Sequence, residues 1–311
     1  MNKMGMRAAG FGLVMALAAG QAMAADAESC KKVRLSDVGW TDIQVTTATT
    51  AAVLEALGYE PEITQLTVPV TFAALKDKDM DVFLGNWMPS QTEAIKPYAD
   101  EGAFDVVGQN LEGAGFGLVV PDYVQAEGVK DIKDLGKFKD KFNAKIYGIE
   151  AGAAGNKNIQ NLIDDPKNGL EGFELVESSE AGMLTEAEQT MKAKDWVVFL
   201  GWTPHPVMGG MKIKYLGGME ASGFGEAKVF TNTRKGYAAE CPNVGAFIKN
   251  VKFTLPMENV MMDAVIKGGN PGDVAKDWLK ANPDAVTPWL AGVTTFDGGD
   301  AVAAVKAALA N

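Results

Sequence analysis

Histidine and cysteine are scarce in this sequence. Its 311 residues include one histidine, His205, and two cysteines, Cys30 and Cys241. Zinc and non-haem iron sites usually need several such ligands, so we expect neither a metal site nor a cofactor. A Ser-His-Asp mechanism would have to use His205, and no serine or cysteine is placed by the sequence as its nucleophile. We therefore expect a protein that is not an enzyme.

Basic residues are also few. Lysine and arginine number 29 against 40 aspartates and glutamates, which gives a net charge of −11. Nucleic-acid binding needs a basic face, so we expect no nucleic-acid partner. No apolar run beyond the N-terminus reaches the roughly 18 residues of a membrane span. The apolar fraction of 47% is too high for disorder, and the length suggests about two domains.

The N-terminus has the pattern of a secretory signal peptide. Lys3 and Arg7 form a short positive region, residues 11–19 are apolar, and residues 22–24 read Ala-Met-Ala, an A-x-A cleavage site. We predict that residues 1–24 are removed on export. Cys30 is not preceded by a lipobox, so we expect no lipid anchor.

Export affects the interpretation of the cysteines. An oxidising compartment favours pairing, and two cysteines allow one bridge. We predict a Cys30–Cys241 disulfide that ties the mature N-terminus to the C-terminal part. The alternative is two buried free thiols.

Strand and helix patterns alternate along the mature chain. Strand patterns cover residues 32–38, 62–68, 82–84, 145–149 and 196–200. Helix patterns cover residues 41–57, with Gly58 as a stop, then 70–76, and begin again near residue 156. This alternation predicts an α/β fold with largely parallel sheets.

Three tryptophans follow predicted strands, where open α/β sheets bind ligands: Trp40, Trp87 and Trp202. One such tryptophan is more often packing, but three in equivalent places favour an aromatic cage for a quaternary ammonium group. Asp42 lies two residues after Trp40 and could supply a negative charge. The other three tryptophans are assigned to packing: Trp196, Trp278 and Trp289.

Three further stretches have both a functional and a structural interpretation. The glycine-rich segment 148–156 could bind a polar or anionic group through backbone N–H groups, or could simply turn onto a helix; it lacks the GxGxxG spacing. Residues 177–180 are interpreted as a helix cap by Ser178 or Ser179. His205, between two prolines, is interpreted as a locally hydrogen-bonded loop residue.

Several of these segments together resemble the periplasmic choline-binding proteins of ABC importers, within the wider glycine betaine/proline betaine-binding family. The segments are residues 35–42, 81–89, 145–150, 176–180, 199–206, 240–245 and 288–293. The resemblance implies a two-lobed, type II-like binding-protein fold with a hinge, each lobe a mixed, mostly parallel sheet flanked by helices. The implied lobe A is residues 25–112 plus 212–311, and lobe B is residues 113–211.

The resemblance also implies a ligand site. The residues carried over are Trp40, Asp42, Trp87, Phe116, Ala153 and Trp202. Phe116 stands where the family pattern has a tyrosine, and Ala153 where it has an asparagine that contacts the ligand hydroxyl. Both departures leave choline, glycine betaine and carnitine open as ligands.

The function expected from this resemblance is capture of a quaternary ammonium compound and its delivery to a membrane permease driven by a separate ATPase. We expect the binding protein to be a monomer. One alternative is a periplasmic choline-ester hydrolase with His205 as general base. Another is a signalling receptor domain, which the lack of a membrane span disfavours.

Overall fold

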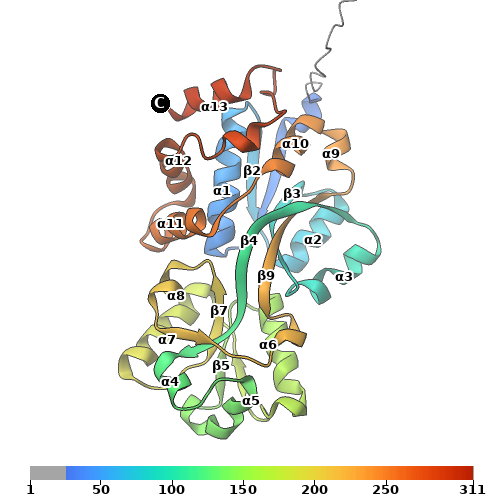
Figure 1. Ribbon diagram of the computed structural model, residues 1–311. Coiled ribbons are helices and arrows are strands. Elements are labelled where there is room, and N and C mark those ends of the chain that lie inside the picture. Colours follow the sequence, from blue (N-terminus) through green and yellow to red (C-terminus); the bar gives the residue numbers. More distant parts are fainter. Residues whose placement is uncertain (1–25, 311) are drawn as a thin grey trace, which may run out of the picture.

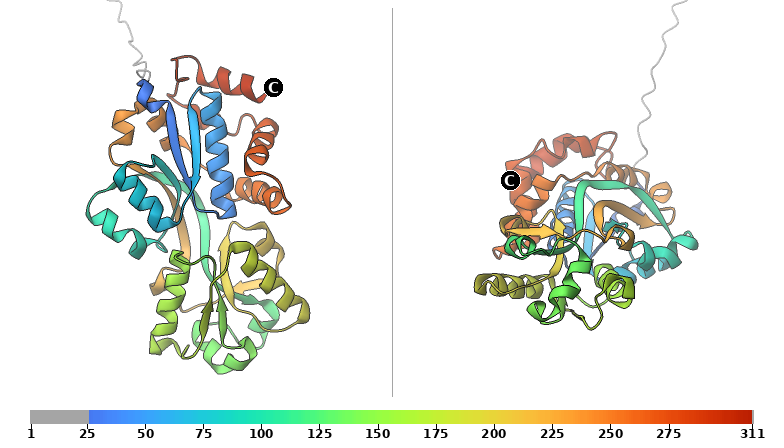
Figure 2. Two further views of the ribbon diagram at one scale, coloured as in Figure 1. Left: turned by 180° about the vertical axis from the view of Figure 1, so that it is seen from behind. Right: turned by 60° about the horizontal axis from the view of Figure 1, so that its bottom comes forward.

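The computed structural model describes residues 26–310 and shows an α/β protein with two lobes. Lobe A, at the top of Figure 1, contains the N- and C-terminal parts of the chain, and lobe B contains the middle part. Two long strands run from one lobe into the other, as the left view in Figure 2 also shows. The signal peptide predicted for residues 1–24 lies outside the described residues.

The strands of residues 26–310 form one nine-stranded sheet in which β2-β1-β3-β9-β4-β7-β5-β6 is the order and β8 pairs with β4. Their bounds are β1 Lys32–Asp37, β2 Glu60–Gln65, β3 Val82–Met88, β4 Phe104–Pro121, β5 Lys145–Tyr147, β6 Glu174–Val176, β7 Phe199–Thr203, β8 Ile213–Tyr215 and β9 Gly225–Arg234. β1 pairs in parallel with β2 and β3, and β5 pairs in parallel with β6 and β7. All pairs that involve β4 or β9 are antiparallel.

Helices cover the sheet in both lobes. In lobe A they are α1 Thr41–Ala56, α2 Val68–Asp77, α3 Thr92–Asp100, α9 Tyr237–Glu240, α10 Pro242–Asn250, α11 Leu255–Ile266, α12 Pro271–Ala281 and α13 Ala301–Leu309. In lobe B they are α4 Asp122–Ala126, α5 Ile132–Leu135, α6 Ala154–Asp164, α7 Glu180–Ala193 and α8 Pro206–Gly210. The 3-10 helices are η1 Glu28–Cys30, η2 Gly136–Phe142, η3 Pro166–Asn168, η4 Glu220–Ser222 and η5 Thr287–Leu290.

Helix α1 is the central helix of lobe A. Most of its residues are buried, because the sheet lies on one side and α11 and α12 pack on the other. Gly58 follows its end with a φ of +90°, a conformation that only glycine adopts without strain, so the predicted stop is confirmed. None of the helices within residues 26–310 combines the length and apolar character needed to cross a membrane.

The chain passes from lobe A to lobe B within β4 and returns to lobe A along β9. The first crossing lies within β4, close to the boundary predicted after residue 112. Strand β8 pairs with the end of β4 in lobe B, and the chain returns to lobe A only along β9. We therefore propose to keep the first boundary and to move the second from residue 211 into β9.

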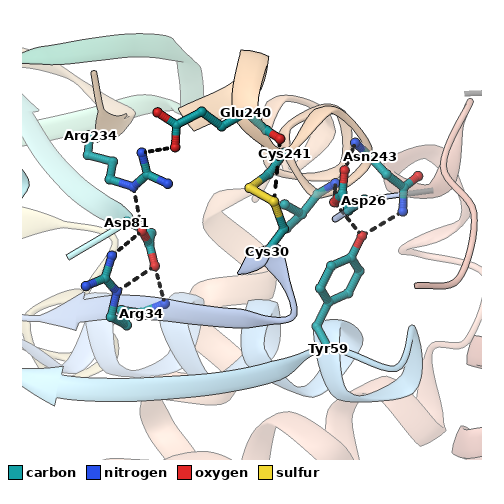
Figure 3. Close-up of a disulfide and its surroundings, with 10 residues drawn as sticks. Asp26, Cys30, Arg34, Tyr59, Asp81, Arg234, Glu240, Cys241 and Asn243 are labelled. Carbon is teal, nitrogen blue, oxygen red and sulfur yellow. Dashed lines mark hydrogen bonds and ion pairs between the residues drawn. A yellow bond between two sulfur atoms is a disulfide. The ribbon is translucent and has the colours of Figure 1, made fainter. Parts of the chain in front are cut away.

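The predicted disulfide is confirmed: Cys30 and Cys241 are bonded, with 5.7 Å between their Cα atoms. Figure 3 shows a second tie beside it, because the Asp26 carboxylate accepts hydrogen bonds from the Tyr59 hydroxyl and from the Asn243 backbone N–H, each at 2.8 Å. Both ties fix residues 26–30 to the beginning of α10.

We expect the double variant Cys30→Ser/Cys241→Ser to be less stable than the wild type by about 2–3 kcal/mol, because the bridge closes a loop of 211 residues and so restricts the unfolded chain. Chemical denaturation of the two oxidised proteins measures the difference. The serines leave the ligand site untouched, so ligand affinity is the internal control. Equal denaturation midpoints would contradict the expectation.

Candidate functional site

An apolar cavity lies between the two lobes, and aromatic side chains from both lobes line it. Lobe A contributes Trp40, Asp42, Trp87, Ser90 and Gln91, and lobe B contributes Phe116, Ile149, Ala154, Gly155 and Trp202. Five of the six residues predicted to bind ligand are therefore together in one cavity. The sixth, Ala153, lies beside it and lines an adjoining groove.

The backbone positions of the tryptophans differ in part from the prediction. Trp40 stands directly before α1, after β1, as expected. Trp87 and Trp202, however, lie inside strands rather than after them: Trp87 pairs with Val229 and Trp202 with Phe116. The antiparallel partners β9 and β4 extend these two strands beyond their apolar runs, which the runs alone could not indicate.

Hydrogen bonds and ring contacts fix the orientations of the aromatic side chains. The Trp40 indole donates to Glu150 of lobe B at 2.8 Å, and the Trp87 indole donates to Asp42 at 3.1 Å. The ring of Trp87 lies 6.0 Å from that of Phe116, between centroids. Rings held in this way line the cavity without further ordering cost.

The carboxylate of Asp42 is buried at the wall of the cavity. One of its oxygens accepts from Trp87, and the other has no hydrogen-bond partner within residues 26–310. Burial, and secondly the neighbouring Glu180, raise the pKa of Asp42 to about 8. Burial and then Asp42 raise the pKa of Glu258 on α11 well above its ordinary range.

The ionisable residue that lines the cavity, Asp42, is an acid, and further acids lie beside it. Burial also raises the pKa of Glu150, against the hydrogen bond from Trp40, which lowers it. No lysine, arginine or histidine is among the described residues that line the cavity. A cation in the cavity would therefore stabilise ionised carboxylates around it.

The glycine-rich segment after β5 forms a structured turn into α6. The Asn156 side chain accepts from the Ile149 N–H at 2.9 Å and donates to the Ile149 carbonyl at 2.8 Å. The N–H of Ala153 donates to the Glu150 carbonyl, so this N–H does not face a ligand. Gly155 lets α6 approach Phe116, because an added Cβ would lie 2.7 Å from the ring. The turn thus shapes the cavity wall.

His205 is buried next to the cavity, with both ring nitrogens engaged. Its Nδ1 accepts from the Met208 N–H at 3.4 Å, and its Nε2 lies 3.1 Å from a Glu180 oxygen. The local hydrogen bond predicted for His205 is present, but its second partner, Glu180, is 25 residues away in the sequence. No group of three or more residues suited to hold a metal occurs in the part of the chain that the structure describes.

Three carboxylates near the cavity were not predicted: Glu150, Glu180 and Glu258. Ser179 caps α7 by accepting from the Gly182 N–H, as predicted for this stretch, but the bonds of Glu180 to the other lobe were missed. No sequence pattern indicates that Glu258 belongs to the site, because an acid on an amphipathic helix is usually exposed. Only the packing of α11 against α1 places it beside Asp42.

Comparisons with known proteins agree with this geometry. Residues 31–281 match the family model described as the substrate-binding domain of an ABC-type glycine betaine transport system. A solved ABC-transporter choline-binding protein in complex with choline is 49% identical, with a TM-score of 0.89 over 91% of this chain and all of that one. The same type of protein in an unliganded, semi-closed conformation gives a TM-score of 0.83 with 48% identity, over 91% of this chain and all of that one.

Comparison with known protein sequences also finds relatives of this chain. A glycine betaine/carnitine transport binding protein of Listeria monocytogenes is 34% identical over 54% of this chain and 55% of its own length. An uncharacterised protein of Chromohalobacter salexigens is 49% identical over 42% of this chain and 84% of its own. The family model spans most of the chain, and so this protein belongs to the family of substrate-binding domains of ABC-type glycine betaine transport systems.

Proposed function

We propose that this protein captures a cationic quaternary ammonium compound, choline in the first place, and delivers it to an ABC permease. The observation that carries the proposal is the cavity in which Trp40, Trp87, Phe116 and Trp202 surround a space beside the buried Asp42 carboxylate. A trimethylammonium group cannot donate hydrogen bonds, so aromatic faces and a nearby negative charge are what recognises it.

The magnitudes favour such a ligand. Each aromatic face contributes on the order of 0.5–2 kcal/mol to a desolvated cation. Four faces and one carboxylate thus offset the cost of association and support affinities of about 1 µM or better. The relatives support the proposal too, since one is a choline complex and another is named for glycine betaine and carnitine.

Ligand capture would close the lobes. Trp40 and Trp87 belong to lobe A and Trp202 to lobe B, so only a closed arrangement surrounds the ligand with all of them. This differential contact is what shifts the population towards closure. The higher TM-score to the choline complex than to the semi-closed protein supports a closed arrangement here.

The remaining parts of the proposal concern where the protein is located and which partner receives the ligand. Export through the signal peptide at residues 1–24 would place the protein in the periplasm, as expected for an importer's binding protein. There a monomer would dock on a permease whose ATPase subunits supply the energy. The six ligand residues, including Ala153 beside the cavity, stay part of this proposal.

Calorimetric titration of the mature protein with choline, glycine betaine, carnitine and proline betaine tests the proposal. We expect choline to bind most tightly and to raise the melting temperature by mass action. Tetramethylammonium, which has the cationic head alone, should bind more weakly but measurably. If none of these compounds binds, the proposed function is wrong.

Choline affinity should depend on pH through Asp42. Because the free carboxyl has a pKa of about 8 and choline needs the ionised form, the affinity should rise by up to roughly tenfold per pH unit below 8, then level off. The raised pKa also makes the ligand-free protein lose stability as pH rises from about 3.8 to about 8. Titrations between pH 6 and 9 measure the first effect.

The control for this pH dependence is Asp42→Asn, which keeps an oxygen for the Trp87 indole but cannot ionise. The variant should bind choline less tightly at pH 9 and lose most of the slope. Glycine betaine, which has no net charge, should lose less affinity than choline. A wild-type slope in the variant would assign the titration to Glu258, whose pKa is also raised beside Asp42.

A further inference from the structure

The side chain of Glu180 accepts three hydrogen bonds, two of which connect the two lobes. It begins α7 in lobe B and is buried. Its carboxylate accepts from the Thr41 N–H at 3.0 Å and from the Thr41 hydroxyl at 2.6 Å, both in lobe A. The third donor is His205 at 3.1 Å. Because Nδ1 of His205 accepts from the Met208 N–H, Nε2 carries the proton and donates to Glu180.

These three donors have the chemistry of a carboxylate-binding site. They combine a backbone N–H in the first turn of α1, a hydroxyl and an imidazole N–H, all of which favour an anion. The set also lies next to the aromatic cavity. Thr41 directly follows Trp40, and the His205 ring packs edge-on against Trp202 with 5.0 Å between centroids.

We propose, on the basis of the proposed function, that Glu180 determines specificity by occupying this donor set with the protein's own carboxylate. A quaternary ammonium compound with a carboxylate of its own, such as glycine betaine or carnitine, then finds the nearby donors taken. Its carboxylate would also approach Glu180, and Asp42 at a pH at which that residue is ionised, with no basic side chain lining the described cavity to compensate. Like charges in such contact reject the wrong ligand, whereas a cation such as choline meets no repulsion.

The test compares Glu180→Ala with the wild type in calorimetric titrations with choline and with glycine betaine. Removal of the carboxylate frees Thr41 and His205 for a ligand carboxylate and removes one negative charge. We expect the ratio of choline to betaine affinity to fall at least tenfold, through weaker choline binding and tighter betaine binding. Melting temperatures of the ligand-free proteins show whether the variant is folded.

Glu180→Gln serves if the alanine variant does not fold. Its single amide oxygen replaces only one of the two carboxylate oxygens, so the donor set stays partly filled while the charge is lost. The affinity ratio should fall in the same direction by a smaller factor. An unchanged ratio in the folded Glu180 variants would overturn the inference.

Glu150→Ala is the matched control, because Glu150 is also an acid that joins the lobes but holds only the Trp40 indole. It should weaken choline binding without any gain for betaine. Two results would contradict a role of Glu180 in specificity. One is a loss of choline affinity and betaine affinity by the same factor in Glu180→Ala. The other is a gain of betaine affinity in Glu150→Ala as large as that in Glu180→Ala. Failure of choline to bind the wild type would instead contradict the proposed function.

Discussion

Replacement of Trp202 or Trp87 by alanine is expected to weaken choline binding more than 100-fold. Each change removes a cation–π contact of up to about 2 kcal/mol and the apolar contact area of an indole, and about 2.7 kcal/mol is enough for a factor of 100. The two residues lie in different lobes, so either loss leaves one side of the cavity without its aromatic face. Calorimetric titration at pH 8 or above measures both.

Two controls separate this effect from loss of fold. Trp202→Phe keeps an aromatic face and should lose less affinity than the alanine variant. Trp278→Ala changes a tryptophan on α12 that is assigned to packing, and it should bind choline like the wild type. Wild-type affinity in both cavity variants, Trp202→Ala and Trp87→Ala, would show that the aromatic cavity is not the ligand site.

The elements that the sequence predicted well are those with their own local signal. Residues 41–57 form α1 nearly as predicted, because apolar residues continue until Gly58 stops the helix. The strands predicted at residues 32–38 and 145–149 are β1 and β5, each one or two residues shorter. In β1 the apolar residues Val33 and Leu35 alternate with polar residues and are buried, and this two-residue period is visible in the sequence alone.

The crossing strand β4 was not predicted, and its composition explains why. Residues 104–121 contain glycines and polar residues in place of an apolar run or a strict alternation. The segment becomes a strand because β9, β7 and β8 pair with it. Tertiary pairing of this kind overrides local propensity, and it also placed Trp87 and Trp202 inside strands.

The candidate site could be predicted as far as its aromatic residues, because tryptophan after an apolar run is a rare and visible pattern. Its acids could not, since 40 acidic residues give no way to pick Glu180 or Glu258. Their roles depend on contacts between segments distant in the sequence, such as Thr41 with Glu180. Only the assembled lobes bring those contacts about.

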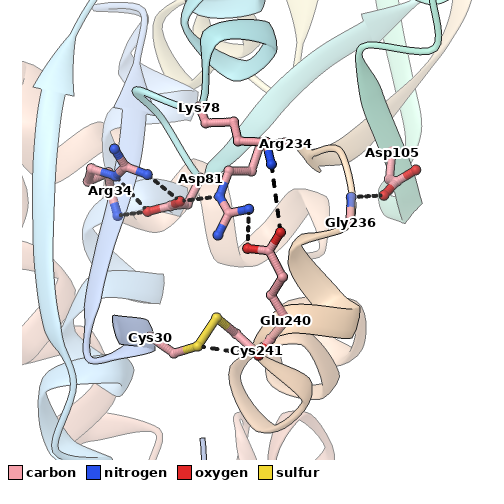
Figure 4. A network of polar contacts seen from close by, with 9 residues as sticks. All are labelled: Cys30, Arg34, Lys78, Asp81, Asp105, Arg234, Gly236, Glu240 and Cys241. Atoms are coloured by element: carbon pink, nitrogen blue, oxygen red, sulfur yellow. Dashed lines mark hydrogen bonds and ion pairs between the residues drawn. A yellow bond between two sulfur atoms is a disulfide. The ribbon is translucent and has the colours of Figure 1, made fainter. Parts of the chain in front are cut away.

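A second large effect is expected far from the cavity, at the buried Asp81 just before β3. Figure 4 shows its carboxylate between two arginines: Arg34 of β1 donates to it at 2.9 and 2.7 Å, and Arg234 of β9 donates at 2.7 Å. Arg234 also donates to Glu240, next to the disulfide. A single carboxylate thus joins β1, from the N-terminal part of lobe A, to β9, which leads into its C-terminal part.

The Asp81→Ala variant should unfold with a free energy about 3–4 kcal/mol lower than the wild type, because it leaves two arginines without their partner. Arg234 is the more costly of the two, with a side chain only 10% exposed against 30% for Arg34. Burial alone would raise the pKa of Asp81, yet the arginine hydrogen bonds lower it. The stability it contributes is thus present above its ordinary pKa of 3.8 and is lost as pH falls below that value.

Chemical denaturation at pH 7 and at pH values below 3.8 measures this loss, and Lys235→Ala is its control. Lys235 bonds to Asp105 with side chains 63% and 37% exposed, so its removal should cost less than about 1 kcal/mol. Choline affinity should stay unchanged in both variants, since none of these residues lines the cavity. If Asp81→Ala were as stable as Lys235→Ala, the two arginines would be adequately solvated without Asp81, and the network would not hold lobe A together.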